Sequence, residues 1–182
     1  KVLAMDETPI KAGRKKNASG RGQMKVGYFW PIYGDRDEVV FPFATTRSGK
    51  VVQETLREYV GVLLTDGYEV YERYAASING MVHAQCWAHS RRKFFEAGPS
   101  EPALASKALL YIDTLYEEEA KLREASASPE KVLAHRGEHS KPIVDALYEW
   151  LSTTLVENAL LPTNPFTKAA QYTLERKKSL RV

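Results

Sequence analysis

The chain has 182 residues, of which 43% are hydrophobic and 27% are charged, and these proportions exclude a wholly disordered or fibrous protein. No apolar run approaches the roughly 20 residues that a membrane-spanning helix needs, so we expect no membrane partner. A single cysteine excludes an internal disulfide and favours a reducing cytoplasm. The 26 basic and 23 acidic side chains leave a net charge of +3, which is too small an excess to establish nucleic-acid binding. The distribution of the charges therefore has to decide that question.

The first half of the sequence predicts strands joined by turns. Apolar, aromatic and β-branched runs indicate five strands: Val2–Met5, Val26–Tyr33, Val39–Thr45, Gly61–Thr65 and Met81–Trp87. The turn residues Gly34–Asp37 indicate a hairpin between the second and third of these strands. Pro31 and Pro42 should bulge those two strands or place them at a sheet edge, because proline has no N–H for the ladder. Short helices are expected over Val51–Tyr59 and Tyr68–Ala76.

The second half predicts helices, because from Ala88 onward apolar residues repeat at three- and four-residue spacing. We expect a break at Leu161–Pro165 and a last helix over Phe166–Leu180. A strand–helix–strand order makes parallel neighbours with a right-handed crossover, so the sequence predicts a mixed α/β sheet with helices on it. The chain begins at Lys1 rather than Met and ends at Val182 directly after a helical pattern, so we also expect a piece of a longer protein.

Two aspartates, Asp6 and Asp66, each end a short apolar strand. If these strands are parallel neighbours, about 5 Å apart, the two carboxylates face one another at the carboxyl edge of the sheet. Two such anions repel, so a cation between them is favoured, and oxygen ligands favour Mg²⁺ or Mn²⁺. A pair of such ions supports phosphodiester cleavage and transfer. The alternative is that each aspartate is simply a turn or cap residue.

A second cluster surrounds the end of the last predicted strand. We reject a zinc site at His83, Cys86 and His89, because strand side chains alternate between faces and a fourth ligand is lacking. His89 is followed by three cations, Arg91, Arg92 and Lys93, which places phosphate-binding groups at a helix start. The alternative is a solvated helix face. Phe94 and Phe95, which come next, are predicted to be core residues.

The polar stretch Lys11–Lys25 is predicted to be a loop or a hairpin tip. It carries a group of closely spaced cations: Arg14, Lys15, Lys16, Arg21 and Lys25. These side chains can neutralise several phosphates, which would make binding salt-dependent. The alternative is a mobile, solvated loop.

Several of these segments resemble the transposases of insertion-sequence family sixty-six. The resemblance lies in Asp6-Glu7-Thr8-Pro9, in Thr65-Asp66-Gly67-Tyr68 with Tyr71, and in the run Cys86-Trp87-Ala88-His89-Ser90-Arg91-Arg92-Lys93-Phe94-Phe95. Val26–Asp35 and the tail Ala170–Leu174 are similar too. The resemblance covers nearly the whole chain, with the helical part from about 98 to 160 similar in character more than in letters.

The resemblance implies a ribonuclease H-like fold: a mixed five-stranded sheet flanked by helices, with a helical insertion after the last strand. It implies an Asp–Asp–Glu triad on two divalent ions, Mg²⁺ or Mn²⁺, with Asp6 as the first acid and Asp66 as the second. Cys86 and His89 match a pattern that lies near the active site in several transposase groups. Glu175 precedes Arg176 inside a helix where the family does not place its catalytic glutamate, so the third acid is expected beyond Val182.

The expected organisation has three parts: residues 1–97 as the first part of the catalytic core, 98–165 as the helical insertion, and 166–182 as a helix leading to the rest of the core. The resemblance implies a DDE-type enzyme that hydrolyses phosphodiesters and transfers strands at insertion-sequence ends. DNA would be the partner, in a homo-oligomeric full-length complex in the bacterial cytosol at the nucleoid. A fragment without the third acid should be inactive. The alternatives are another ribonuclease H-like nuclease and a non-catalytic DNA-binding or dimerisation module.

Overall fold

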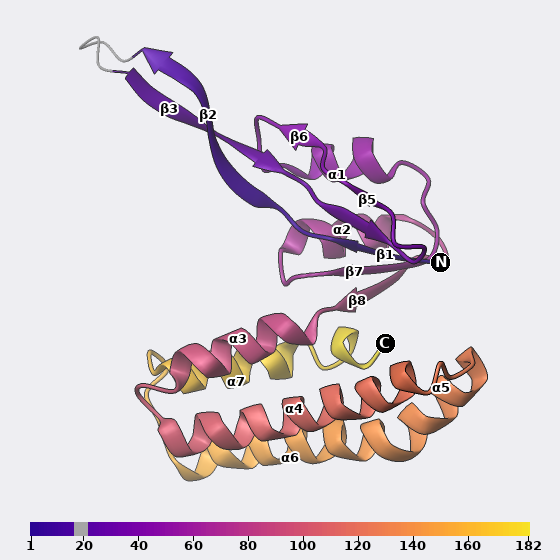
Figure 1. Ribbon diagram of the computed structural model, residues 1–182. Coiled ribbons are helices and arrows are strands. Elements are labelled where there is room, and N and C mark those ends of the chain that lie inside the picture. The colour runs from indigo at the N-terminus through magenta and orange to yellow at the C-terminus, as the bar shows by residue number, and fades with distance from the viewer. Residues whose placement is uncertain (17–21) are drawn as a thin grey trace. The chain divides into compact units, whose positions relative to one another are not determined.

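The computed structural model describes residues 1–16 and 22–182 (Figure 1). It divides into two compact units, Lys1–Cys86 with Val182, and Trp87–Arg181. The boundary at Cys86 precedes helix α3, whereas the predicted core part extends to residue 97, and that functional division stays a prediction. Among the helices of the described ranges, none is long and apolar enough to cross a bilayer.

The first unit contains the predicted mixed five-stranded sheet. Its order is β5-β4-β1-β7-β8, with β1 in the centre. The strands are β1 (Val2–Met5), β4 (Ile32–Gly34), β5 (Val39–Val40), β7 (Val62–Thr65) and β8 (Val82–Gln85). β1 runs parallel to β7 and β7 parallel to β8, while β4 is antiparallel to both β1 and β5. The predicted hairpin at Gly34–Asp37 is confirmed by the β4–β5 pair.

Helix α1 (Gly49–Leu56) precedes β7 in the chain, and helix α2 (Glu69–Ser77) connects β7 to β8. The expected helix 51–59 is confirmed but ends earlier, because Arg57 adopts a positive φ of 50° that an α-helix cannot continue through. The core of the unit gathers apolar side chains from β1, β4, β7 and both helices, with Trp30 from the segment between β3 and β4: Met5, Trp30, Ile32, Val52, Leu56, Leu63, Tyr71 and Tyr74.

The stretch Lys11–Lys25, predicted to be a loop or a hairpin tip, belongs to a hairpin, but its described residues are strand rather than loop. Strands β2 (Thr8–Lys16) and β3 (Gly22–Phe29) form a long antiparallel hairpin, to which β6 (Phe43–Ala44) adds a third strand at the inner end. Arg21 lies outside the described residues. The outer part of β2 carries mainly charged residues, whereas in β3 Met24 and Val26 alternate with Lys25 and are exposed.

The two prolines divide the predicted strands, as their missing N–H groups require. Pro31 separates β3 from β4, so the run Val26–Tyr33 belongs to two different sheets. Pro42 separates β5 from β6 in the same way. The expected edge position is confirmed for the run Val39–Thr45, because β5 and β6 are both edge strands. It is wrong for the run Val26–Tyr33, because β3 and β4 each have a neighbouring strand on both sides and Pro31 lies between them.

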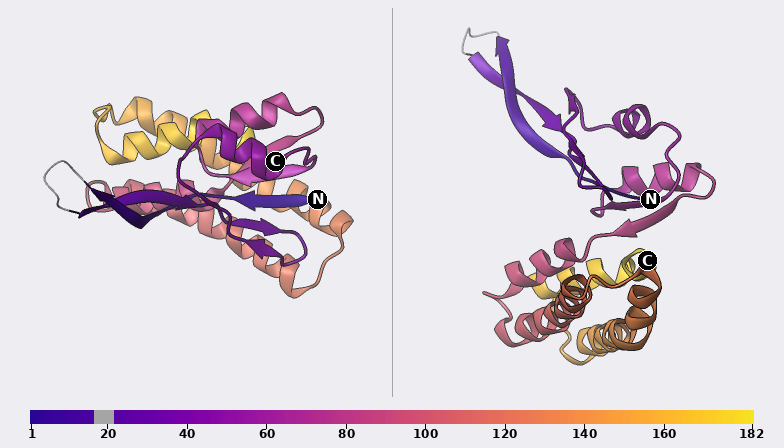
Figure 2. Two further views of the ribbon diagram at one scale, coloured as in Figure 1. Left: turned by 90° about the horizontal axis from the view of Figure 1, so that it is seen from above. Right: turned by 45° about the vertical axis from the view of Figure 1, so that its right-hand side comes forward.

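The second unit is helical: α3 (Trp87–Ala97), α4 (Pro102–Glu124), α5 (Pro129–His135), a π-helical turn (Arg136–Ser140), α6 (Lys141–Glu157), α7 (Pro165–Glu175) and a 3-10 turn (Ser179–Arg181). Helix α3 lies beside α7, and α4 beside α6 (Figures 1 and 2). The predicted last helix to Leu180 ends at Glu175, and the strand predicted to reach Trp87 ends at Gln85.

One core prediction in this unit is wrong. Phe94 is fully buried against Phe166, with ring centroids 5.7 Å apart. Phe95, its neighbour in the chain, is 67% exposed. Ser90, Phe94 and Ala97 follow one another at four- and three-residue spacing and are the buried residues of α3, so they form the face that packs. Phe95 lies off that face.

Candidate active site

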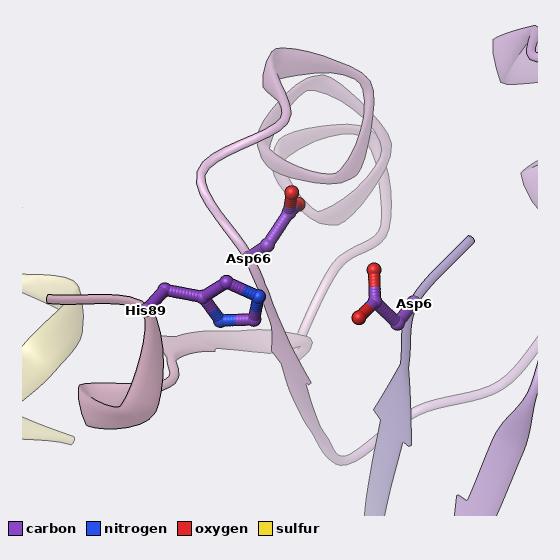
Figure 3. Close-up of side chains that lie close together, drawn as sticks. All are labelled: Asp6, Asp66 and His89. Carbon is purple, nitrogen blue, oxygen red and sulfur yellow. The ribbon is translucent and has the colours of Figure 1, made fainter. Parts of the chain in front are cut away.

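The two aspartates meet because β1 and β7 are parallel neighbours in register. Leu3 pairs with Leu63 and Ala4 with Leu64, so Asp6 and Asp66 leave the sheet at the same level. A carboxylate oxygen of Asp6 lies within 4.8 Å of one of Asp66. Figure 3 shows both carboxylates at the ends of their strands, and it also labels His89. Asp6 and Asp66 therefore lie together at one edge of the sheet, as the sequence predicts.

Each carboxylate is oriented by a nearby backbone N–H. Asp6 Oδ1 accepts a hydrogen bond from the N–H of Glu7 at 2.8 Å, and the N–H of Asp6 itself donates to the carbonyl of Pro31 at 3.2 Å. Asp66 Oδ1 accepts one from the N–H of Tyr68 at 2.8 Å, which closes a turn at the start of α2. The positive end of that helix dipole also favours an anion there. Asp66 is thus a turn residue as well as a member of the pair.

Sequence reasoning missed a third acidic residue beside the pair, Glu7. Its side chain is only 2% exposed and lies in an ion pair with Arg47, whose Nε donates to Oε1 at 2.5 Å. The Tyr71 hydroxyl donates to the other carboxylate oxygen at 2.6 Å. Burial raises the pKa of Glu7, and the hydrogen bonds from Tyr71 and Arg47 oppose that rise.

The surroundings of Glu7 are aromatic. The Arg47 guanidinium lies over the ring of Tyr68 at 4.0 Å, and the Tyr68 and Tyr71 rings meet edge to face at 6.0 Å. Burial, and after it the hydrogen bond to Glu7, raises the pKa of the Tyr71 hydroxyl, which keeps that hydroxyl protonated as a donor. The motif tyrosines therefore have a structural role, because they fix the carboxylate that directly follows Asp6.

The donor set of the aspartate pair fits a hard divalent cation. It consists of carboxylate oxygens, which Mg²⁺ and Mn²⁺ prefer, and neither aspartate is buried. Mg²⁺ usually binds through one or two carboxylates and keeps several waters or substrate phosphates as further ligands. Asp6 and Asp66 are thus a suitable set for an ion that also touches a phosphate.

The basic residues after Cys86 lie on helix α3 and differ in their surroundings. Arg91 donates from Nε to Asp113 of α4 at 2.8 Å, so it joins two helices of its own unit. Arg92 is exposed, and the Lys93 ammonium lies 4.4 Å from the centre of the Tyr172 ring. His89 is the third residue of the helix. Their expected contacts with DNA stay predictions.

The remaining motif residues have identifiable positions. The backbone N–H of Cys86 donates to the carbonyl of Thr65 at 2.9 Å, next to Asp66. The ring nitrogen Nε2 of His83 bonds the Thr65 hydroxyl at 2.9 Å. Trp87 serves the helical unit, since its Nε1 donates to the carbonyl of Leu180 at 2.9 Å. Glu175, at the end of α7, has a side chain that is 71% exposed.

The cations of the predicted loop lie elsewhere in the fold. Arg14, Lys15 and Lys16 are the last residues of β2, paired through their backbones with Met24, Gln23 and Gly22.

Paired carboxylates at the carboxyl ends of adjoining parallel strands, in a mixed sheet, are typical of enzymes that cleave or transfer phosphodiesters with divalent cations. The chain matches the family described as Transposase IS66 family over residues 1–182. It therefore belongs to that family, and the resemblance noted in its motifs is confirmed.

Two similar proteins come from Sinorhizobium fredii. The uncharacterized protein y4hP is 34% identical over 162 residues, which cover 79% of this chain and 29% of that protein. The uncharacterized protein y4qI is 28% identical over 180 residues, which cover 90% of this chain and 32% of that protein. The chain thus spans about three tenths of the length of the curated relatives it matches.

Proposed function

We propose that this chain is the part of a DDE-type transposase that holds the first two catalytic acids, Asp6 and Asp66, on a ribonuclease H-like core. The complete protein would hydrolyse a phosphodiester at the end of an insertion sequence and transfer the freed strand to target DNA. The observation that carries the proposal is the pair of carboxylate oxygens within 4.8 Å on adjoining parallel strands, in a chain of a transposase family.

In this proposal Asp6 and Asp66 hold Mg²⁺ or Mn²⁺. When bound, a pair of such ions activates an attacking oxygen and stabilises the leaving oxygen. The N–H groups of Glu7 and Tyr68 keep one oxygen of each aspartate in place, so both carboxylates are oriented before the ions bind. Orientation in advance lowers the entropy lost on binding.

Further residues have secondary roles in the proposal. His89, with Cys86 before it, lies near the reacting phosphate, and Arg92 and Lys93 bind the DNA backbone. Glu175 has no catalytic role, so the third acid comes from another part of the complete protein, and this chain by itself has little activity. The complete protein works as a homo-oligomer on DNA in the bacterial cytosol.

The test is the substitution Asp6→Asn in the complete protein, with excision and strand transfer measured separately. The change preserves the acceptor for the Glu7 N–H and removes the charge, so we expect both reactions to be abolished. Asp37→Asn, in the turn between β4 and β5, is the matched control and should leave both unchanged. Normal excision by Asp6→Asn would refute the proposal. Cleavage without strand transfer by the unaltered protein would identify a nuclease of the same fold instead.

A further inference from the structure

We propose that the β2–β3 hairpin, residues 8–16 and 22–29, is a duplex-DNA-binding ribbon that works independently of the aspartate pair. The proposal takes DNA as the partner from the proposed function and assigns it a second contact surface. It rests on the charge of the hairpin, on its two-stranded outer part and on its connection to Asp6.

The excess positive charge of the chain is concentrated in residues 8–29. Between Thr8 and Phe29 the sequence has six basic residues and no acidic residue. Outside that segment the chain has 20 basic and 23 acidic residues, so the rest of the protein is net negative. The net charge of +3 therefore arises entirely from residues 8–29, and five of the six basic residues belong to the described strands of the hairpin. Such an asymmetry favours a polyanionic partner at this place.

The outer part of the hairpin is a ribbon with little packing. β6 pairs only with the inner end of β3, at Tyr28 and Phe29. Farther out, Met24 is 48% and Val26 50% exposed, and Lys11 and Lys25 are exposed as well. Figure 1 shows β2 and β3 continuing together past β6. An isolated two-stranded ribbon is only marginally stable in water, so a binding partner accounts for this one better than a packing role does.

Duplex DNA fits both the shape and the charge of this ribbon. A two-stranded antiparallel ribbon is one of the elements that the major groove admits. Lys11 lies opposite Val26 in the ladder, next to Lys25, and Arg14, Lys15 and Lys16 continue β2 outward, so cations are spaced along the ribbon. Cations along such a ribbon can neutralise several phosphates of a duplex.

The ribbon is also connected directly to the proposed catalytic pair. β2 begins at Thr8, two residues after Asp6, and both belong to the same compact unit. The N–H of Asp6 is bonded to the carbonyl of Pro31, just beyond the end of β3. β2 thus begins, and β3 ends, next to the edge of the sheet that carries the acids. Lys11 is five residues after Asp6, so a duplex bound at Lys11 lies within about 17 Å of Asp6 along the strand.

The experiment measures binding of this chain to a short fluorescent duplex by anisotropy, in EDTA, between 50 and 200 mM salt. The test variant is Lys11→Gln with Lys25→Gln, and the control is Lys131→Gln with Lys168→Gln, which removes the same charge from two exposed lysines of the helical unit. Each lost phosphate contact reduces the slope of log K against log salt by about 0.9. We expect a reduction of about 1 to 2 in the test variant and a dissociation constant raised about 8-fold to 60-fold at 0.1 M salt.

Equal affinities and slopes for the test and control variants would overturn the proposal, and so would the lack of any salt-dependent binding by the unaltered chain. Circular dichroism spectra of both variants establish that they are folded. Because the assay contains no divalent ion, a negative result would contradict the ribbon proposal alone and not the proposed metal-binding role of Asp6 and Asp66.

Discussion

Replacing Asp66 by Asn should stabilise the metal-free chain. An oxygen of each carboxylate lies within 4.8 Å of the other, and two unit charges roughly 5 Å apart repel by about 0.8 kcal/mol in water and by about 3.3 kcal/mol at an effective dielectric constant of 20. Both aspartates are partly exposed, so we expect a gain near the lower value, about 1 kcal/mol. Asn retains the Oδ1 acceptor for the Tyr68 N–H, so the turn before α2 is preserved.

The assay is urea unfolding of the chain with and without Mn²⁺. A gain of about 1 kcal/mol raises the urea midpoint by about 0.3 to 1 M, for slopes of 1 to 3 kcal/mol per M. Mn²⁺ at 100 times its dissociation constant should stabilise the unaltered chain by about 2.7 kcal/mol and the variant much less. The order of the two stabilities therefore reverses when the ion is added.

Two results would refute this reasoning. If Asp66→Asn lowers the midpoint in EDTA, the carboxylates do not repel as their separation implies. If Mn²⁺ stabilises the unaltered chain and the variant equally, the ion binds elsewhere. Asp37→Asn is the control, because its φ of 62° suits asparagine and it lies in the turn between β4 and β5. That variant should show neither the gain in EDTA nor a loss of the Mn²⁺ effect.

Three further predictions concern stability. Phe94→Ala should lower the free energy of unfolding by about 3–5 kcal/mol, because the Phe94 ring is fully buried. Phe95→Ala should lower it by less than about 0.5 kcal/mol, because Phe95 is 67% exposed. Equal urea midpoints for the two variants would contradict this prediction. Arg47→Met should cost about 1–3 kcal/mol, since it leaves the buried Glu7 carboxylate without its ion pair, and an unchanged midpoint would argue against that pair. Burial lowers the pKa of His83 below its ordinary value of 6.5 in the folded chain. As the pH falls, the unfolded chain therefore takes up a proton on His83 before the folded chain does. The contribution of neutral His83 to the free energy of unfolding is thus fully present above pH 6.5 and is lost as the pH falls toward the folded pKa. A titration midpoint at or above 6.5 in the proton NMR spectrum, assigned with His83→Gln, would show that this sign is wrong.

The sheet and the aspartate pair were predictable because both have a local signal. Short apolar runs ending in aspartate identified β1 and β7, and the strand–helix–strand order of β7, α2 and β8 indicated parallel pairing in this part of the sheet. The pairing of β1 with β7 was a condition of the prediction, because these strands lie 60 positions apart in the chain, and the structure meets that condition. Once the two strands are parallel and adjacent, Asp6 and Asp66 lie at the same edge of the sheet.

The β2–β3 hairpin could not be predicted in the same way. Strand signals come from apolar side chains that cover a core, and a ribbon without a core does not need them. Lys11–Lys16 looks like a loop because its strand is held by backbone pairing with β3 alone. In helix α3 the sequence does indicate which phenylalanine is buried. Ser90, Phe94 and Ala97 recur at four- and three-residue spacing on one face of the helix, and Phe95 lies off that face.

Glu7 shows what tertiary contacts add to a motif. Its partners Arg47 and Tyr71 lie 40 and 64 positions away, so no local pattern indicates that its carboxylate is buried and bonded while that of Asp6 stays accessible. Two adjacent acids thus have opposite surroundings. Arg47 compensates the charge of Glu7 within the fold, whereas Asp6 lies beside a second anion, Asp66.

The different surroundings of Glu7 and Asp6 support a functional rather than a structural origin for the pair of Asp6 and Asp66. The turn before α2 needs one acceptor oxygen, which asparagine at position 66 would supply as well as Asp66 does. The N–H of Glu7 likewise needs only one oxygen of Asp6. Two full charges within 4.8 Å therefore lower the stability of the metal-free fold, and the hydrogen bonds from the N–H groups of Glu7 and Tyr68 require neither charge. A ligand that binds both carboxylates explains the charges, because proteins commonly give up stability at the sites where they act.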